Sequence, residues 1–220
     1  MFNFLKKKAA PTDIRDTLFG DMPIDSWIAN NSTSDPWNLF ADAEHAIRDG
    51  KRNGAIELLK NIAGRTDIET RHLLTAWHAL RGLEVQPSES IAGNVLGVVV
   101  EVGLEGGTDL VAAYADHSAR YYNYSGSGVV WEAPDGSLDS AIDALIAAGQ
   151  QVANNIGPWT DPRPPAPANG DVRINMLAPG GLYFGQAPFA LLATDGMGGP
   201  VISAAMTLME ALIAKQEAKP

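Results

Sequence analysis

The sequence predicts an α+β protein: an N-terminal helical layer, then an antiparallel sheet of about five strands with helices mainly on one face. Up to about residue 90, apolar side chains recur every three or four residues, which is the period of an amphipathic helix. From residue 91, β-branched runs joined by glycine-rich turns lead twice into an alanine- and leucine-rich helix, in the order ββ(β)α-ββα. We therefore divide the chain into a helical region, 1–90, and an α+β region, 91–220, which can fold as one compact unit.

Helix signals follow one another through the first region. A short helix is predicted at 12–19, with Thr12 or Asp13 as its cap. Asp35 followed by Pro36 fits an N-cap and a first helical position, where the missing N–H of proline costs nothing. Two further helices are predicted, one at about 52–63 and one that begins at the capping-box sequence Thr66-Asp-Ile-Glu69 and ends at Gly82.

Small residues in this region follow the spacing of a known repeat. The pattern is Ala46-Ile47-x-x-Gly50-x4-Ala55-Ile56-x-x-Leu59. It resembles the middle of a tetratricopeptide unit, in which small residues let two helices cross closely. The resemblance covers about 36–82 and one unit only, whereas a solenoid needs roughly three. It implies a helical hairpin, and it does not extend to the peptide-binding groove of that family.

The α+β region opens with an almost continuously apolar stretch. Residues 95–104 are typical of a central strand that is covered on both faces, apart from the charged Glu101. A turn follows at 105–109, where two glycines supply the backbone freedom that a hairpin needs. A return strand is predicted at 110–115, and the stretches 120–124 and 129–132 add one or two more strands.

The rest of the chain repeats this order. A helix is predicted from Asp135 to about Asn154, and the five prolines between residues 157 and 170 then indicate an exposed crossover. The second unit consists of a strand at 171–178, a strand at 182–194 interrupted near Pro188, and a helix at 200–214. Order β-β-(β)-α-β-β-α is similar to that of small modules of the profilin, roadblock or longin kind, a likeness that implies no activity.

The last predicted helix is apolar around most of its circumference. Its first stripe consists of Val201, Ala205, Leu208 and Leu212. An adjacent stripe consists of Ile202, Met206, Met209 and Ile213. Because such a helix must be covered on more than one side, we expect either the helical layer or another protein to pack over it. The second stripe is therefore the candidate interaction surface.

Polar groups in the predicted sheet form a candidate ligand site. Strand alternation places Arg120, Tyr122 and Tyr124 on one face, and a guanidinium between two phenols suits a carboxylate or a planar ligand. Glu101 interrupts an apolar strand, so its carboxylate must be paired, protonated or facing a cavity. We expect Arg120 or Arg173 as its partner. The alternative is that the tyrosines are ordinary strand residues and that Arg120 is a surface charge.

Composition and missing motifs exclude several functions. The chain has no cysteine, which excludes thiolate metal and redox sites, and no apolar run near eighteen residues, so stable membrane insertion is not expected. The net charge is −10, of which −8 falls from Ile91 onward, and this disfavours nucleic acid. There is no Walker lysine and no nucleophile elbow, so neither a cofactor nor a metal site is predicted.

These observations favour a non-enzymatic interaction or assembly module, acidic and cytoplasmic, that binds a protein partner or a second copy of itself as a homodimer. The alternative is a small-ligand binding or sensor domain with a pocket at the sheet near Arg120. An enzyme with an unfamiliar site built from Asp116, His117 and Arg120 is the third hypothesis.

Overall fold

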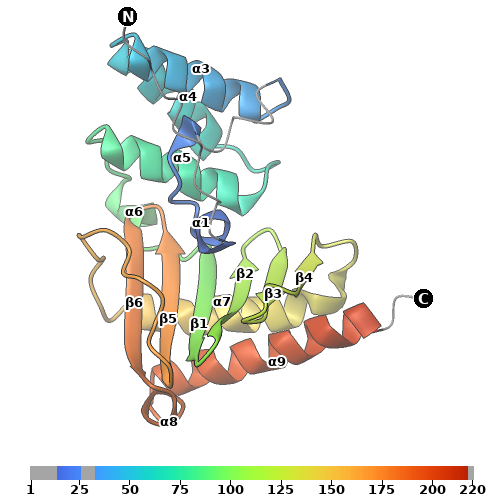
Figure 1. Ribbon diagram of the computed structural model, residues 1–220. Helices are drawn as coiled ribbons and strands as arrows, with labels where there is room; N and C mark the ends of the chain where they lie inside the picture. Colours follow the sequence, from blue (N-terminus) through green and yellow to red (C-terminus); the bar gives the residue numbers. More distant parts are fainter. Residues whose placement is uncertain (1–13, 26–32, 218–220) are drawn as a thin grey trace, which may run out of the picture.

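The computed structural model describes residues 14–25 and 33–217, in which a helical layer stands on one end of an antiparallel sheet (Figure 1). Two long helices cover one face of that sheet. The predicted α+β class is confirmed. The sheet has six strands rather than about five among the described residues, because the stretches 119–122 and 128–131 form separate strands.

The helical layer is held together by its own apolar core. Its helices are α1 (Ile14–Phe19), α3 (Trp37–Arg48), α4 (Arg52–Ala63), α5 (Thr70–Gly82) and α6 (Glu89–Ala92). Phe40, Leu59, Ile62 and Leu80 are almost fully buried between α3, α4 and α5. The predicted caps Thr12 and Asp13 lie outside the described residues.

Two predicted helix starts are wrong in detail. Pro36 is itself the N-cap of α3, and the Asp35 carboxylate accepts a hydrogen bond of 2.7 Å from Arg65 instead of capping the helix. The capping box predicted from Thr66 does not form, since α5 begins at Thr70 and its N-cap Glu69 makes no side-chain capping bond. The N–H of Thr70 instead donates to the carboxylate of Asp116, which lies in the turn between the second and third strands of the sheet.

The strands are β1 (Gly97–Leu104), β2 (Gly107–Tyr114), β3 (Ala119–Tyr122), β4 (Gly128–Trp131), β5 (Asp171–Ala178) and β6 (Gly181–Pro188). They lie in the order β4-β3-β2-β1-β5-β6, and each neighbouring pair is antiparallel. The last strand is shorter than predicted, because Pro188 has no N–H to continue the ladder and residues 189–192 form the short helix α8 (Phe189–Leu192).

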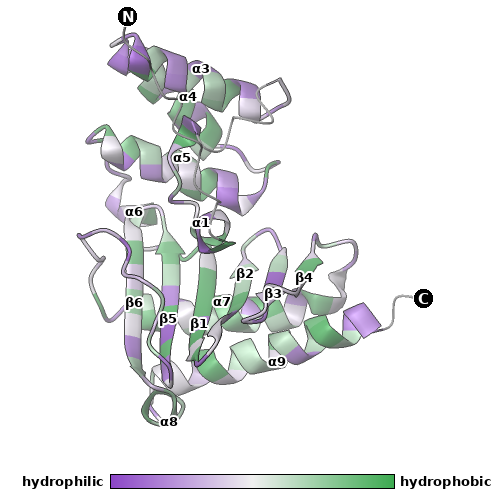
Figure 2. Cartoon of the chain, in the orientation of Figure 1, coloured by the Kyte–Doolittle hydropathy of each residue, from purple (hydrophilic) through white to green (hydrophobic). Residues whose placement is uncertain are grey.

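One face of the sheet is covered by α7 (Asp139–Ala153), which follows a short 3₁₀ turn (Gly136–Leu138), and by α9 (Gly198–Glu217). Close approach is possible because Gly149 has no side chain: a Cβ there would lie 2.6 Å from Cγ2 of Val98. Figure 2 shows β1 as mostly hydrophobic and β5 as hydrophobic with a hydrophilic stretch. Across residues 14–25 and 33–217, no helix combines the length and apolarity that crossing a bilayer requires.

The apolar circumference of α9 is covered largely within the fold. The sheet and α7 pack against it, whereas the helical layer lies at the other end of the strands (Figure 1). Ile202 is only 4% exposed and belongs to the core, so it cannot be part of an open interaction surface. Met209 and Ile213 are half-buried, and Met206 is 46% exposed. Of the predicted stripe, Met206 alone is an exposed side chain.

The opposite face of the sheet carries the helical layer at one end. Val99, Tyr114 and Leu177 pack there with Phe19 of α1 and Leu74 of α5. The hydroxyl of Tyr114 donates a hydrogen bond of 2.7 Å to the carbonyl of Leu18. Farther along this face runs the proline-rich crossover, which approaches β1 so closely that a Cβ on Gly103 would lie 2.0 Å from the carbonyl oxygen of Ala168.

Candidate functional site

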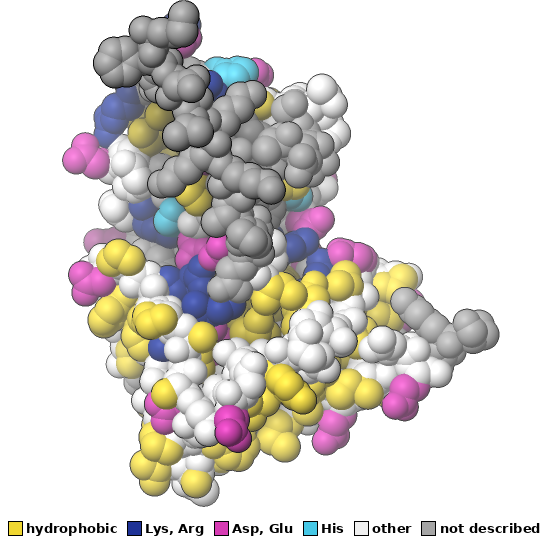
Figure 3. Space-filling view, in the orientation of Figure 1, with side chains coloured by type: hydrophobic (Ala, Val, Ile, Leu, Met, Phe, Trp, Pro, Cys, Tyr) yellow, Lys and Arg dark blue, Asp and Glu magenta, His cyan; other side chains and the backbone are white. Residues whose placement is uncertain are grey.

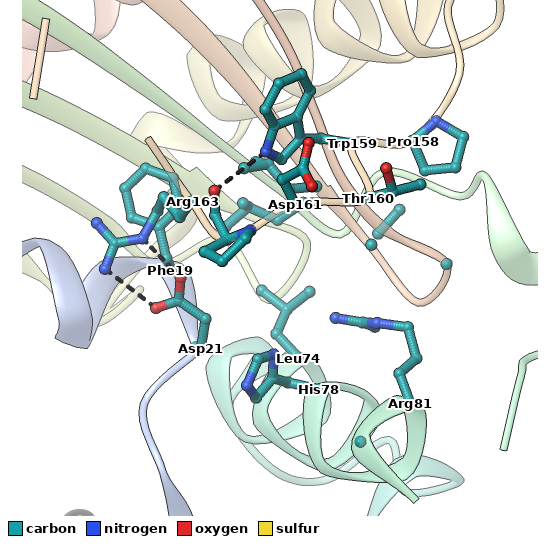
Figure 4. Close-up of a pocket in the computed structure, with 18 of the residues that line it drawn as sticks. Phe19, Asp21, Leu74, His78, Arg81, Pro158, Trp159, Thr160, Asp161 and Arg163 are labelled. Atoms are coloured by element: carbon teal, nitrogen blue, oxygen red, sulfur yellow. Dashed lines mark hydrogen bonds and ion pairs between the residues drawn. The ribbon is translucent and has the colours of Figure 1, made fainter. Parts of the chain in front are cut away.

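A cleft with a volume of about 620 Å³ lies where the helical layer meets the sheet. One wall comes from α1 and α5, and the other from residues 158–163 of the crossover and the turn between β5 and β6 (Figure 4). That turn is fixed against α6, because the N–H of Gly180 donates to the carbonyl of Ala92 at 2.8 Å and a Cβ on Gly180 would not fit. The cleft therefore has a defined shape.

Arg163 lies at one end of the cleft, and its guanidinium is held by two carboxylates and an aromatic ring. Its Nε donates to Asp21 at 2.6 Å, a terminal nitrogen donates to Asp16 at 2.5 Å, and its guanidinium lies 4.4 Å from the ring centre of Phe19. Burial lowers the pKa of Arg163, but the hydrogen bonds and charge of Asp21 and Asp16 outweigh it and raise the pKa overall. Arg163 thus holds α1 to the crossover.

Arg81 on α5 is in a different position. It donates a hydrogen bond of 2.5 Å to the carbonyl of Pro179, and in the described part of the chain it forms no ion pair. Its side chain is half-buried, and this burial lowers the pKa of the guanidinium, although Asp21 opposes the shift. A guanidinium has five N–H donors, so several remain for another acceptor. Figure 4 shows the group directed from α5 into the cleft.

His78 lies three residues before Arg81, which places both side chains on one face of α5. Both line the cleft (Figure 4). His78 is an exposed side chain, but the atoms packed around it keep water from part of the ring; this desolvation, and then the neighbouring guanidinium of Arg81, lower its pKa, while Asp21 opposes them. The imidazole is therefore mostly neutral at pH 7 and offers one donor and one acceptor.

The facing wall is aromatic. Trp159 is 41% exposed, its ring packs edge-on against Phe184 with ring centres 5.1 Å apart, and its indole N–H donates to the carbonyl of Pro162 at 3.1 Å. Its backbone N–H donates to the carbonyl of Leu182 at 2.6 Å, which ties the crossover to β6. Asp161 lies beside Trp159 on this wall (Figure 4).

No protein family, characterised protein or solved structure matches this sequence. The tetratricopeptide likeness of residues 36–82 stays a prediction. Function is therefore inferred from the side chains that the fold brings together.

The predicted ligand site at the sheet is divided into separate clusters. Glu101 has no exposed surface; it accepts hydrogen bonds from Arg15 at 2.5 Å, from Arg173 at 3.4 Å and from the amide of Asn175 at 3.2 Å. The predicted partner Arg173 is present, and Arg15 was not foreseen. Both arginines also donate to the carbonyl of Pro164, near the junction where Figure 3 shows basic side chains gathered.

Arg120 belongs to another cluster. Strand β2 separates it from Glu101, and its guanidinium donates to Glu132 at 2.6 Å and to the carbonyl of Trp131 at 2.8 Å. The expectation of an exposed charge is also wrong, since Arg120 is almost fully buried. Tyr122 is half-buried on the same face, and Tyr124 follows β3 and is 58% exposed. Glu101 and Arg120 therefore do not meet in one pocket.

Asp116, His117 and Arg120, the residues of the enzyme hypothesis, do not come together in one site either. The ring of His117 lies 3.0 Å from Asp143 of α7, on the face of the sheet opposite to Arg120. Asp116 binds α5 through Thr70. Residues 14–25 and 33–217 contain no group of three or more histidine, aspartate or glutamate side chains placed to hold a metal ion.

Sequence reasoning missed the cleft residues Arg81, Trp159 and Arg163 as a set. The three-residue spacing of His78 and Arg81 was visible, and so was a tryptophan within a proline-rich segment. Their apposition depends on how α5 stands on the end of the sheet, which no local pattern encodes.

Proposed function

We propose that this protein is a small-ligand binding or sensor module whose ligand occupies the cleft between α5 and the β5–β6 turn. The observation that carries the proposal is Arg81, a half-buried guanidinium that faces a cleft of about 620 Å³ without a carboxylate partner in the described chain. Ligand pockets have volumes of about 300–1,000 Å³, lie preferentially at junctions between structural units, and combine apolar walls with a few polar groups.

The cost of burying the Arg81 guanidinium also supports a ligand in the cleft. Removing a guanidinium from water is costly unless charge or hydrogen bonds compensate, and one carbonyl satisfies one of the five N–H groups of Arg81. Arg163, which lines the same cleft, pairs with two carboxylates. An acceptor supplied by a ligand would satisfy Arg81 as those carboxylates satisfy Arg163.

Binding is favoured over catalysis by the same residues. His78 forms no hydrogen bond with any described residue, so the cleft lacks the nucleophile–base pair that acyl or phosphoryl transfer uses. Asp21 is held by Arg163 and is not available as a base for a ligand.

A thermal-shift screen of small metabolites tests this function. We expect some compounds to stabilise the wild-type protein, and the variant Leu182→Trp, which fills the cleft, to lose that stabilisation. Ile47→Trp is the control, because Ile47 is 40% exposed on α3, away from the cleft. A screen without any stabilising compound, or with compounds that stabilise Leu182→Trp equally, overturns the proposal.

Self-association is the second candidate function. It is favoured by the apolar side chains Phe189, Leu191 and Met197, which are exposed in and just after α8 at the end of the sheet far from the helical layer (Figure 1). We propose a second copy of this chain as the partner, in the cytoplasm. Light scattering at tens of micromolar tests it: a dimer that Leu191→Glu dissociates supports the proposal, and a wild-type monomer contradicts it.

A further inference from the structure

We infer that the cleft selects small carboxylates, that is, monoanions with an apolar or aromatic body. This inference rests on the proposed function and names the ligand class of the same site. It follows from three features of the cleft: the charges that remain after its internal ion pairs are counted, the geometry of Arg81, and the aromatic wall opposite.

Arg81 stands apart from the other charged groups of the cleft. Among the described residues, four charged side chains line it: Asp21, Arg81, Asp161 and Arg163. Arg163 is paired with two carboxylates, Asp16 and Asp21, so that cluster carries one net negative charge, and Arg81 is the described cleft cation that pairs with no carboxylate. Asp161 stands on the opposite wall, and the residues from Ile91 onward carry a net charge of −8. This surrounding negative charge would repel a dianion or polyanion more strongly than a monoanion.

The shape of Arg81 favours a carboxylate. Its bond to the carbonyl of Pro179 fixes the guanidinium plane, so less side-chain freedom is lost when a ligand binds. The remaining N–H groups form the fork that holds two carboxylate oxygens at once. His78 on the same helix face is neutral at pH 7 and can donate one further hydrogen bond without demanding a second negative charge.

The rest of the cleft suits the apolar body of such a ligand. Leu74 lies on the helix wall, and Trp159 and Leu182 lie on the sheet wall. Trp159 is fixed by its hydrogen bond to Pro162 and by its packing on Phe184, so its exposed ring is a rigid contact surface. Figure 4 shows Leu74 and Arg81 on α5, with Trp159 on the facing wall.

The probes are three compounds with one aromatic body: phenylacetate, its neutral analogue phenylacetamide, and phenyl phosphate. Calorimetry measures their dissociation constants. We expect phenylacetate to bind at least about tenfold more tightly than phenylacetamide, because hydrogen bonds to a charged carboxylate are stronger than hydrogen bonds to a neutral amide. Phenyl phosphate should bind more weakly than phenylacetate. Asp161→Asn should reduce that difference.

Variants of Arg81 distinguish a direct contact between Arg81 and the ligand's carboxylate from the effect of the overall charge of the protein. Arg81→Gln keeps a donor for the carbonyl of Pro179 and should abolish the preference for phenylacetate over phenylacetamide, while Arg81→Lys should keep part of it. Arg48→Gln is the matched control, because it removes one positive charge from the surface of α3 and should leave the preference unchanged. A melting temperature near that of the wild type shows that each variant is folded.

The possible failures are distinguishable. If phenylacetate and phenylacetamide bind equally and Leu182→Trp blocks both, the cleft binds ligands and the carboxylate inference is wrong. A preference for phenylacetate that survives Arg81→Gln, tighter binding of phenyl phosphate, or no binding of phenylacetate also overturns the inference. Loss of all ligand stabilisation in the metabolite screen overturns the proposed function itself.

Discussion

Asp116 and Thr70 exchange two hydrogen bonds across the junction between the sheet and the helical layer. The N–H of Thr70 donates to the Asp116 carboxylate at 2.7 Å, and the N–H of Asp116 donates to the Thr70 hydroxyl at 3.1 Å. Thr70 is the first residue of α5, so a carboxylate from the β2–β3 turn supplies the acceptor that an N-cap residue normally provides. The sheet thereby orients the helix that carries His78 and Arg81 into the cleft.

Removing the Asp116 carboxylate is expected to destabilise the protein. Asp116→Ala leaves the N–H groups of Thr70 and Ser118 without their acceptor, and losses of this kind cost about 1–3 kcal/mol. Urea unfolding measures the change. Asp143→Ala is the control, because Asp143 is an exposed carboxylate that contacts His117 of the same turn, and it should leave stability nearly unchanged. Equal stability of Asp116→Ala and the wild type would contradict this role.

The buried cluster around Glu101 predicts a larger loss. Glu101→Ala removes the carboxylate that Arg15 and Arg173 share, and breaking a buried ion pair by removing one partner costs about 3–5 kcal/mol. The free energy of unfolding in urea measures the loss. Combining Glu101→Ala with Arg15→Met and Arg173→Met should recover part of it, because the two buried positive charges that Glu101 balances are then gone.

A control and a further variant sharpen this test. Glu57→Ala removes an exposed carboxylate that pairs with Lys60 on α4, and its effect should be close to zero. Arg15→Met alone should destabilise the protein and also loosen α1, which native-state hydrogen exchange would detect at residues 14–19. A triple variant no more stable than Glu101→Ala would rule out the electrostatic explanation.

Local patterns predicted the elements of this fold, and distant contacts decided the site. Strand alternation and the apolar run around Glu101 indicated a carboxylate in need of a partner, and Arg173 lies directly opposite it on β5. Arg15 is 86 residues away in the chain and reaches Glu101 only because α1 packs on the sheet. Arg120 shares the predicted face, but the strand order placed β2 between it and Glu101.

The last helix shows the same division. Its apolar circumference correctly indicated cover on more than one side, yet the sequence could not say that α7 and the sheet provide it. The cleft depends on how α5 meets the β5–β6 turn, through contacts such as that of Arg81 with Pro179, which is 98 residues away. Contacts of that range have no signature in periodicity or spacing.

A pair of glycine substitutions tests the packing of the crossover. Gly103→Ala places a methyl group 2.0 Å from the carbonyl oxygen of Ala168, so β1 or the crossover must move, and we expect a loss of about 1–3 kcal/mol in urea unfolding. Gly54→Ala meets no atom within 4 Å and lies within α4, so it should stabilise the protein by about 0.5–1 kcal/mol. A crossover detached in solution would make Gly103→Ala harmless, which would refute this packing.

The pH dependence of stability should reveal His72. Its ring is buried beside Trp37, with ring centres 4.8 Å apart, and burial lowers its pKa below the ordinary value of 6.5 although Glu69 and Asp116 oppose the shift. The unfolded chain therefore binds the proton more tightly than the folded protein. Stability from this group is complete above pH 6.5 and falls as the pH drops through that value towards the lowered pKa of the folded state.

His72→Gln removes this titration, so its stability should vary less than that of the wild type between about pH 7.5 and 5.5. Urea unfolding at several pH values measures both slopes. His78, whose pKa is lowered in the same direction, remains in the variant and contributes the residual slope. Asp116 does not interfere in this window, because its carboxyl has a pKa lowered from 3.8 by hydrogen bonds from Ser118 and Thr70 that outweigh its burial. The stability that the Asp116 carboxylate contributes is lost only in more acidic solution. Identical slopes for the variant and the wild type would therefore contradict the prediction: they would show that His72 is protonated as easily in the folded protein as in the unfolded chain.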